Sequence, residues 1–139
     1  MTPLDTVRQI YAAFGRGDVP AIVALMSEDV HWEAWADNTG QRAGVPWLLP
    51  RHGAAGVGDF FRLIGQFTIH EFEVLSIMAN QHQVAAEFVI DATPPGGQRY
   101  RDEEMHLWTC DGAGKVTRLR HYTDTAKHIA AAGPLLARN

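Results

Sequence analysis

The chain has 139 residues, of which 46% are hydrophobic, and its formal net charge is −4. This length suits one domain with a single core, and the acidic balance argues against nucleic acid or an anionic membrane as the main partner, because both attract basic patches. The single cysteine, Cys110, favours a reducing cytoplasm, and we expect neither a signal peptide nor a membrane-spanning segment.

Two helices and a strand are predicted at the start of the chain. Thr2 and Pro3 form a typical helix start. Apolar residues then recur at helical spacing until Gly15, namely Leu4, Val7, Ile10, Tyr11 and Phe14. Asp18 is expected to cap a shorter helix that extends to Met26. Residues 30–35 are then expected to form a strand.

Residues 36–53 show no clear period and surround a small apolar island, Trp47 to Leu49. A loop of this length in a compact domain is often a lid or a binding loop, and the alternative is an insertion folded over the outer surface. Residues 54–67 return to helical spacing. Their apolar stripe consists of Val57, Phe60, Phe61, Ile64 and Phe67.

The second half of the chain has the period of two that is typical of strands. Strands are predicted over residues 68–79 and 82–92, followed by a hairpin over residues 101–124 that turns at Asp111 to Gly114. Asp124 is expected to cap a short helix over residues 125–132, and residues 133–139 are expected to form a tail. Helices that segregate from an antiparallel-rich sheet make the class α+β, with one domain over residues 1–132. A curved sheet wrapped on a long helix would leave a conical cavity.

The hairpin carries the candidates for chemistry. Glu104, His106 and Trp108 share one face of the first arm, and Leu119 and His121 share one face of the second. An imidazole can act as an acid or a base near neutral pH, so two histidines in one cavity could move protons. Glu104 could orient His106 or act as a further acid/base group. The alternative is a pair of half-buried histidines with ordinary structural partners.

Aromatic walls are expected around these groups, and they suit a planar hydrophobic ligand. The predicted substrate-binding residues are Trp32, Trp108, Tyr11, Phe61 and Leu119. No third ligand stands at a recognised spacing from the histidine pair, so we predict no metal and no cofactor.

Other polar residues receive weaker assignments. Asp102 is expected to lie where the first arm frays into solvent. Arg118, Arg120 and Tyr122 face away from His121, on a surface that suits a homodimer interface. The remaining histidines are assigned no role: His31, His52, His70, His82 and His128.

Two stretches resemble a known family. IYAAFGRGDVPAIVALMSEDVHWE, from Ile10 to Glu33, resembles the opening of SnoaL-like domains, and HLWTCDGAGKVTRLRHYTDT, from His106 to Thr125, resembles their last two strands. These domains belong to the nuclear transport factor 2-like superfamily, with ketosteroid isomerases, polyketide cyclases and limonene epoxide hydrolases. The resemblance implies a cone-shaped, strongly curved mixed sheet packed against three N-terminal helices (a cystatin-like α+β roll), a short C-terminal helix and a dimer through the outer sheet face.

The resemblance also implies positions for the chemistry. His106 falls where ketosteroid isomerases carry the acid that binds the oxyanion, but Ala34 falls at their proton-abstracting aspartate and cannot accept a proton. His121 falls at the water-activating aspartate of the epoxide hydrolases, whose arginine and second aspartate correspond to Phe88 and Ile90. Polyketide cyclases resemble the chain better, because they use acid/base groups on the last two strands, including a histidine, and need no metal.

The sequence therefore predicts a small cofactor-independent enzyme of the isomerase or cyclase type. It would act by acid/base chemistry on a hydrophobic carbonyl compound, polyketide-like or steroid-like. Two alternatives stay open: a non-catalytic domain of the same fold that binds a hydrophobic ligand or dimerises, and an epoxide or ester hydrolase.

Overall fold

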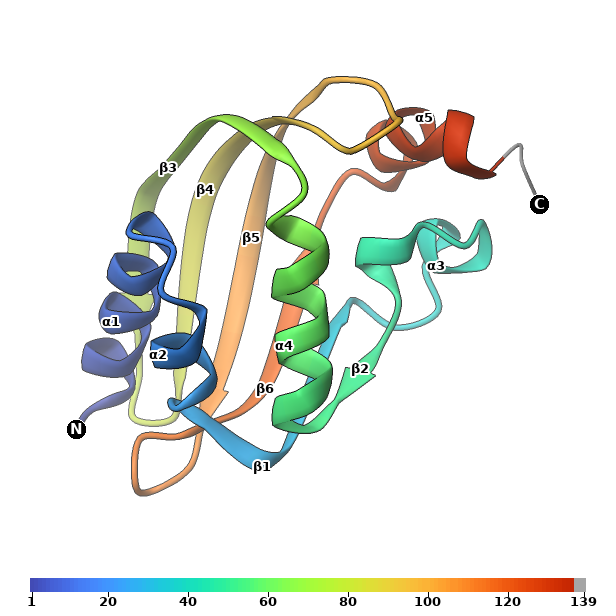
Figure 1. The fold of residues 1–139 in the computed structure, drawn as a ribbon. Helices are drawn as coiled ribbons and strands as arrows, with labels where there is room; N and C mark the ends of the chain where they lie inside the picture. The colour runs from blue at the N-terminus through green and yellow to red at the C-terminus, as the bar shows by residue number, and fades with distance from the viewer. Residues whose placement is uncertain (137–139) are drawn as a thin grey trace.

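A curved, open, six-stranded mixed sheet forms the centre of the computed structural model, which describes residues 1–136 (Figure 1). The strands are β1 (Met26–Ala34), β2 (Arg51–His52), β3 (Thr68–Ala79), β4 (Gln83–Thr93), β5 (Tyr100–Cys110) and β6 (Val116–Tyr122). Their order is β2-β1-β6-β5-β4-β3. Only the β1–β6 pair is parallel within this described sheet. The predicted α+β class with a curved mixed sheet is therefore confirmed.

The helices cover the concave face and one end of the sheet (Figure 1). They are α1 (Pro3–Gly15), α2 (Val19–Val23), α3 (Thr39–Arg42), α4 (Gly53–Ile64) and α5 (Thr125–Leu136), with a 3₁₀ turn η1 (Pro46–Leu48). α1, α2 and α4 lie over the concave face, whereas α3 and α5 lie at one end. None of the helices within residues 1–136 has the length and apolar character needed to cross a membrane.

The helix predicted up to Met26 ends earlier, at Val23, and Met26 already begins β1. The carbonyl of Leu25 accepts a hydrogen bond from the Val116 amide at 2.9 Å, and Met26 pairs with Val116 of β6. Strand pairing across the sheet thus overrides the helical spacing of Leu25 and Met26.

The segment of residues 36–53 is structured rather than a bare loop, since it contains α3, η1 and β2. Asn38 caps α3 through a bond from the Gln41 amide at 2.9 Å. Trp47 and Leu48 are buried. The segment packs against the α5 end of the molecule, where Thr39 and Thr125 share a hydroxyl hydrogen bond of 2.6 Å.

The last helix is longer than predicted. Asp124 does cap it, because its side chain accepts the Ala126 amide at 3.1 Å. The prediction that it ends at residue 132 is wrong, since α5 continues through Gly133 and Pro134 to Leu136. A proline this close to a helix end removes few backbone bonds, and the chain tolerates it. Residues 137–139 of the predicted tail lie outside the described residues.

Candidate active site

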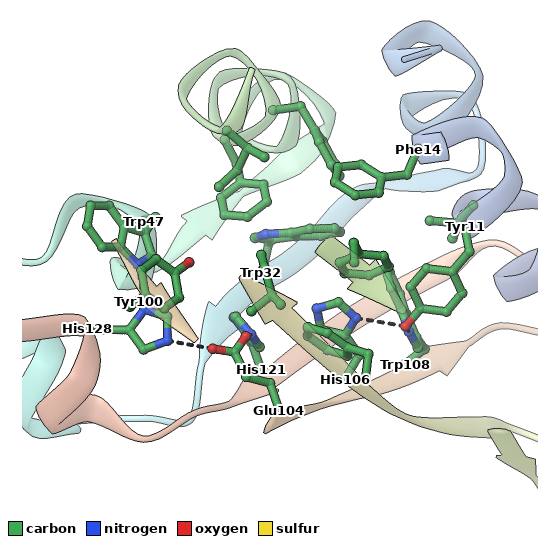
Figure 2. A pocket seen from close by; sticks show the side chains of 17 residues that line it. Tyr11, Phe14, Trp32, Trp47, Tyr100, Glu104, His106, Trp108, His121 and His128 are labelled. Carbon is green, nitrogen blue, oxygen red and sulfur yellow. Dashed lines mark hydrogen bonds and ion pairs between the residues drawn. The ribbon is translucent and has the colours of Figure 1, made fainter. Parts of the chain in front are cut away.

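An apolar inner cavity of about 70 Å³ lies between the concave face of the sheet and helices α1 and α4 (Figure 2). Four of the five predicted wall residues line it: Tyr11, Trp32, Phe61 and Trp108. The prediction for Leu119 is wrong. Leu119 is buried in the core, where its strand neighbours across the sheet are Trp32 and Trp108, and those two larger rings occupy the wall in its place.

Both candidate histidines line this cavity. The register of the β5–β6 hairpin places His106 directly opposite His121, with ring centroids 4.9 Å apart. Phe88 and Ile90 line the same space, so apolar side chains occupy the positions that the resemblance assigns to an arginine and an aspartate. Ala34 is buried beside His121, as its partner on β1.

A chain of three side chains, the tyrosine network, fixes the proton of His106. The indole N–H of Trp108 donates to the Tyr11 hydroxyl at 3.1 Å, and that hydroxyl lies 2.7 Å from Nδ1 of His106 (Figure 2). An indole can only donate, so the hydroxyl accepts from Trp108. Within residues 1–136 its only other hydrogen-bond partner is His106, which therefore receives the hydroxyl proton. Nδ1 of His106 is therefore the acceptor, and we assign the ring proton to Nε2 from this network.

The protonation states of both partners support this assignment. Burial raises the pKa of Tyr11 far above its ordinary value, although the Trp108 hydrogen bond acts in the opposite direction, so the phenol keeps its proton. Burial, followed by the nearby His121, lowers the pKa of His106 well below its ordinary value, and Glu104 offsets this only in part. His106 is thus a neutral ring that offers an N–H to the cavity.

A second set of bonds, the glutamate network, surrounds the buried carboxylate of Glu104 (4% exposed). Nε2 of His121 lies 2.5 Å from Oε1, and Nε2 of His128 lies 2.5 Å from Oε2 (Figure 2). Behind His128, the indole N–H of Trp47 donates to Nδ1 at 2.8 Å. The prediction that Glu104 could orient His106 is not met, because its two oxygens contact His121 and His128 instead.

The carboxylates beside His128 and the indole of Trp47 act in opposite directions on the protonation of His128. Burial lowers its pKa, but the hydrogen bonds and charges of Asp102 and Glu104 outweigh burial, and these influences alone would raise it to about 9. The Trp47 indole acts against that charge, because a doubly protonated ring would point a second N–H at the indole N–H across 2.8 Å. With this bond intact, we assign His128 as the neutral ring with its proton on Nε2.

The state of Glu104 follows from its donors. Burial raises its pKa, but its contacts with His121 and then with His128 prevail and lower it well below the ordinary value. An ionised carboxylate can only accept, so His121 carries a proton on Nε2 and turns Nδ1 elsewhere.

Two ring nitrogens of the site, Nε2 of His106 and Nδ1 of His121, have no partner within residues 1–136. Neither is among the fully enclosed unpaired atoms, which are Arg51 Nε and Thr123 Oγ1. Both ring nitrogens are accessible to a bound molecule.

Asp102 is buried (3% exposed), so the prediction that it frays into solvent is wrong. It accepts the Asp124 amide at 3.1 Å and lies 3.7 Å from the Lys127 ammonium and 3.3 Å from Nε2 of His128. α5 covers this end of β5 and supplies Lys127 and His128, and Asp124 directly precedes this helix. The alternation of the strand, which puts Asp102 on the same face as Glu104, was the available signal for its burial.

Asp102, Glu104 and His128 bring possible metal-ligand atoms within 4.8 Å of one another. Two atoms bound to one ion at about 2.0–2.2 Å in tetrahedral geometry lie roughly 3.3 Å apart. The 2.5 Å contact between His128 and Glu104 is shorter than that and is a hydrogen bond. The contact geometry therefore fits a hydrogen-bonded network better than a bound ion.

Two members of the network, His128 and Trp47, were not predicted. His128 is 1% exposed and shares a helical stripe with the buried Ala131 and Ala132, which was a usable sign that it faces inward. Trp47 belongs to the apolar island, but nothing local indicated its partner 81 residues away. The residues assigned to the outer sheet face, Arg118 and Arg120 among them, are absent from the cavity wall as described.

The model of the SnoaL-like domain family matches residues 7–119. No curated protein sequence matches the chain. Solved structures do resemble it, among them an NTF2-like protein from Burkholderia xenovorans LB400 with a TM-score of 0.78 and 21% identity, which covers 94% of this chain and 97% of that one.

Two further similar structures are enzymes by name. An LEH-like epoxide hydrolase from M. tuberculosis has a TM-score of 0.69 and 17% identity and covers 98% of this chain and 93% of that one. SalBIII, an epoxide hydrolase/cyclase-like enzyme with a role in pyran ring formation in the polyether salinomycin, has a TM-score of 0.69 and 20% identity, over 90% of this chain and 92% of that one. At these identities the likeness shows the fold alone.

Proposed function

The chain belongs to the SnoaL-like domain family, and from that premise we propose that it is a small isomerase or cyclase that uses acid/base chemistry on a hydrophobic carbonyl compound, polyketide-like or steroid-like. Its own side chains supply the acid and the base. In this proposal His121 and His106 are the catalytic residues, and Glu104, His128 and Tyr11 position them.

One observation carries the proposal: the two histidines of one apolar cavity offer opposite hydrogen-bonding groups. The tyrosine network leaves His106 with a free N–H, and the glutamate network leaves His121 with a free ring nitrogen. An acceptor and a donor with ring centroids 4.9 Å apart can contact the acidic carbon and the carbonyl oxygen of one substrate.

The reaction follows from these roles. Nδ1 of His121 takes the proton from the carbon next to the carbonyl, and Nε2–H of His106 donates to the oxygen as it becomes an enolate. The positive charge that develops on His121 faces the carboxylate of Glu104. His121 then returns the proton to another carbon, which completes an isomerisation. Alternatively, the enolate carbon attacks a second carbonyl, which closes a ring, and His121 gives its proton to the alkoxide that forms. The apolar wall strengthens each of these interactions relative to water.

The fold neighbours support a second candidate, epoxide hydrolysis. The same pair would serve it, with His121 activating a water and His106 donating to the epoxide oxygen as the ring opens. The LEH-like and SalBIII enzymes of this fold carry names that point to epoxide chemistry. Their low identity makes this the weaker candidate.

Deuterium exchange tests the main proposal. Hydrophobic ring ketones would be incubated with the protein in D₂O, and the loss of protons next to the carbonyl would be followed by NMR. We expect exchange by the unchanged protein, a loss of about 10²-fold or more in His121→Gln and a smaller loss in His106→Gln. His82→Gln, at an exposed histidine in the β3–β4 turn, is the matched control and should leave the rate unchanged. Ketones that shift the tryptophan signals without any exchange would instead identify a receptor.

A further inference from the structure

An open groove on the outside of the molecule adjoins the inner cavity. This outer groove, of about 640 Å³, lies between α1, α2, the C-terminal end of α4 and β3. Both spaces share five wall residues: Tyr11, Phe14, Phe61, Ile64 and Phe72. The Phe14 ring packs against Phe72 and Phe61, with centroids 5.1 Å and 6.1 Å away, so one layer of aromatic side chains separates the groove from the cavity.

The groove carries no charged side chain among its described wall residues. Beyond the shared residues, its wall contains three glycines and five apolar side chains: Gly15, Gly17, Gly65, Val19, Ile22, Phe67, Ile69 and Val74. The hydroxyl of Tyr11 is turned inward to His106. A solvent-open surface without charges, in a chain that is 20% charged, is typical of a binding surface for an apolar group.

The sizes of the two spaces differ in a way that bears on the substrate. Pockets that enclose a whole small ligand measure about 300–1,000 Å³. The inner cavity, at about 70 Å³, is far below that range and has room for a reacting group only. The outer groove, at about 640 Å³, is within it.

We propose that the outer groove binds the hydrocarbon tail of the substrate whose carbonyl end reaches His106 and His121. The substrate class is then an elongated carbonyl compound with an apolar tail, such as an acyl chain, rather than a compact molecule enclosed in the cavity. For the tail to reach the groove, the side chains of the layer formed by Phe14, Phe61 and Phe72 must move apart. The inference rests on the proposed function for the nature of the reacting end, but tail binding itself requires no proton transfer.

Methyl ketones of increasing length, from butanone to decanone, are the probes. Their dissociation constants would be measured from the imidazole NMR signals of His106 and His121. Each buried methylene contributes about 0.8 kcal/mol, or about fourfold in affinity, so affinity should rise by that factor per carbon as the tail fills the groove.

Two glycine variants distinguish ligand binding in the groove from ligand binding in the cavity. A Cβ added at Gly15 meets no atom within 4 Å, and Gly15 lines the groove, so the ring of Gly15→Phe would occupy groove space. Gly58→Phe is the control, because a Cβ at Gly58 is equally free and Gly58 lies outside both walls as described. Gly15→Phe should abolish the gain with chain length and leave butanone binding unchanged. Gly58→Phe should keep the gain.

Three results would overturn the proposal: affinity that does not depend on chain length, long ketones that bind Gly15→Phe as well as the unchanged protein, or a change of oligomeric state in Gly15→Phe by light scattering. The last result would make the groove an interface between copies of the chain. A chain-length dependence that persists while no ketone exchanges its protons would support the tail site and reject the proposed enzyme.

Discussion

Glu104→Gln is the sharpest test of the assigned protons, because the structure dictates which way the new amide must turn. Trp47 donates to Nδ1 of His128, so a neutral His128 must keep its proton on Nε2 and needs an acceptor there. The amide oxygen therefore faces His128, and the amide NH₂ faces Nε2 of His121. The opposite orientation would set two N–H groups 2.5 Å apart. His121 must then move its proton to Nδ1, and the free base is lost.

The expected losses differ for activity and for stability. In serine proteases, replacing the carboxylate that orients the histidine by an amide holds the wrong tautomer and lowers kcat by about 10⁴-fold. We expect proton exchange from ring ketones to fall by about 10³- to 10⁴-fold in Glu104→Gln. The free energy of unfolding should fall by only about 1 kcal/mol, because both hydrogen bonds are remade between neutral groups.

Long-range ¹H–¹⁵N correlation spectra distinguish the two tautomers of His121 directly, and urea unfolding gives the stability. Glu103→Gln is the matched control, since Glu103 is the exposed neighbour on the same strand, and it should change neither tautomer nor exchange rate. If His121 keeps its proton on Nε2 in Glu104→Gln while exchange continues at the original rate, the assigned roles are wrong.

Three further outcomes are expected. In Tyr11→Phe the ring proton of His106 should no longer be fixed on Nε2, and exchange should slow by about tenfold or more. The free energy of unfolding should fall by about 1–3 kcal/mol, because the buried indole of Trp108 loses its acceptor. A variant that matches the unchanged protein in both assays would contradict the tyrosine network. Trp47→Phe should allow His128 to become charged, with the raised pKa of about 9 that its carboxylates impose. The stability gained from that charge is complete below about pH 6.5 and is lost as the pH rises through about 9, so urea unfolding should show a decline in this variant that the unchanged protein lacks. Finally, we propose a homodimer through the outer sheet face, and Tyr122→Asp, at a 39% exposed tyrosine, should convert it to a monomer by light scattering; a protein that is monomeric without the substitution would rule the dimer out.

Strand alternation was sufficient to predict half of the site. It put Glu104 and His106 on one face of β5 and His121 on one face of β6, because the period of two depends only on local backbone geometry. The same alternation also indicated that Asp102 is buried. Asp102 stands between two charged residues, Arg101 and Glu103, a composition typical of an exposed strand end, but the period of two holds through them.

The other half depends on contacts between distant segments. His128 meets Glu104 only because α5 folds back over the end of β5, and Trp47 reaches His128 from a segment whose short helices have no strong period. Strand pairing can also override a local preference. Met26 belongs to a helical pattern in the sequence, but it pairs with β6 and forms part of β1. Such contacts become visible only when the chain is folded, because no short-range spacing encodes them.

The buried polar groups around Glu104 are better explained by function than by stability. A buried carboxylate with two imidazoles often contributes no more to stability than well-packed apolar side chains of the same volume. What the two networks add is a fixed direction of donation along their hydrogen bonds. Each ends in an indole, Trp108 in one and Trp47 in the other, and an indole N–H can only donate. A hydroxyl or an amide at either end could donate or accept, and the protons of both networks could then reverse. With indoles there, His106 faces the cavity as a donor, and Glu104 holds His121 as an acceptor, before any substrate arrives.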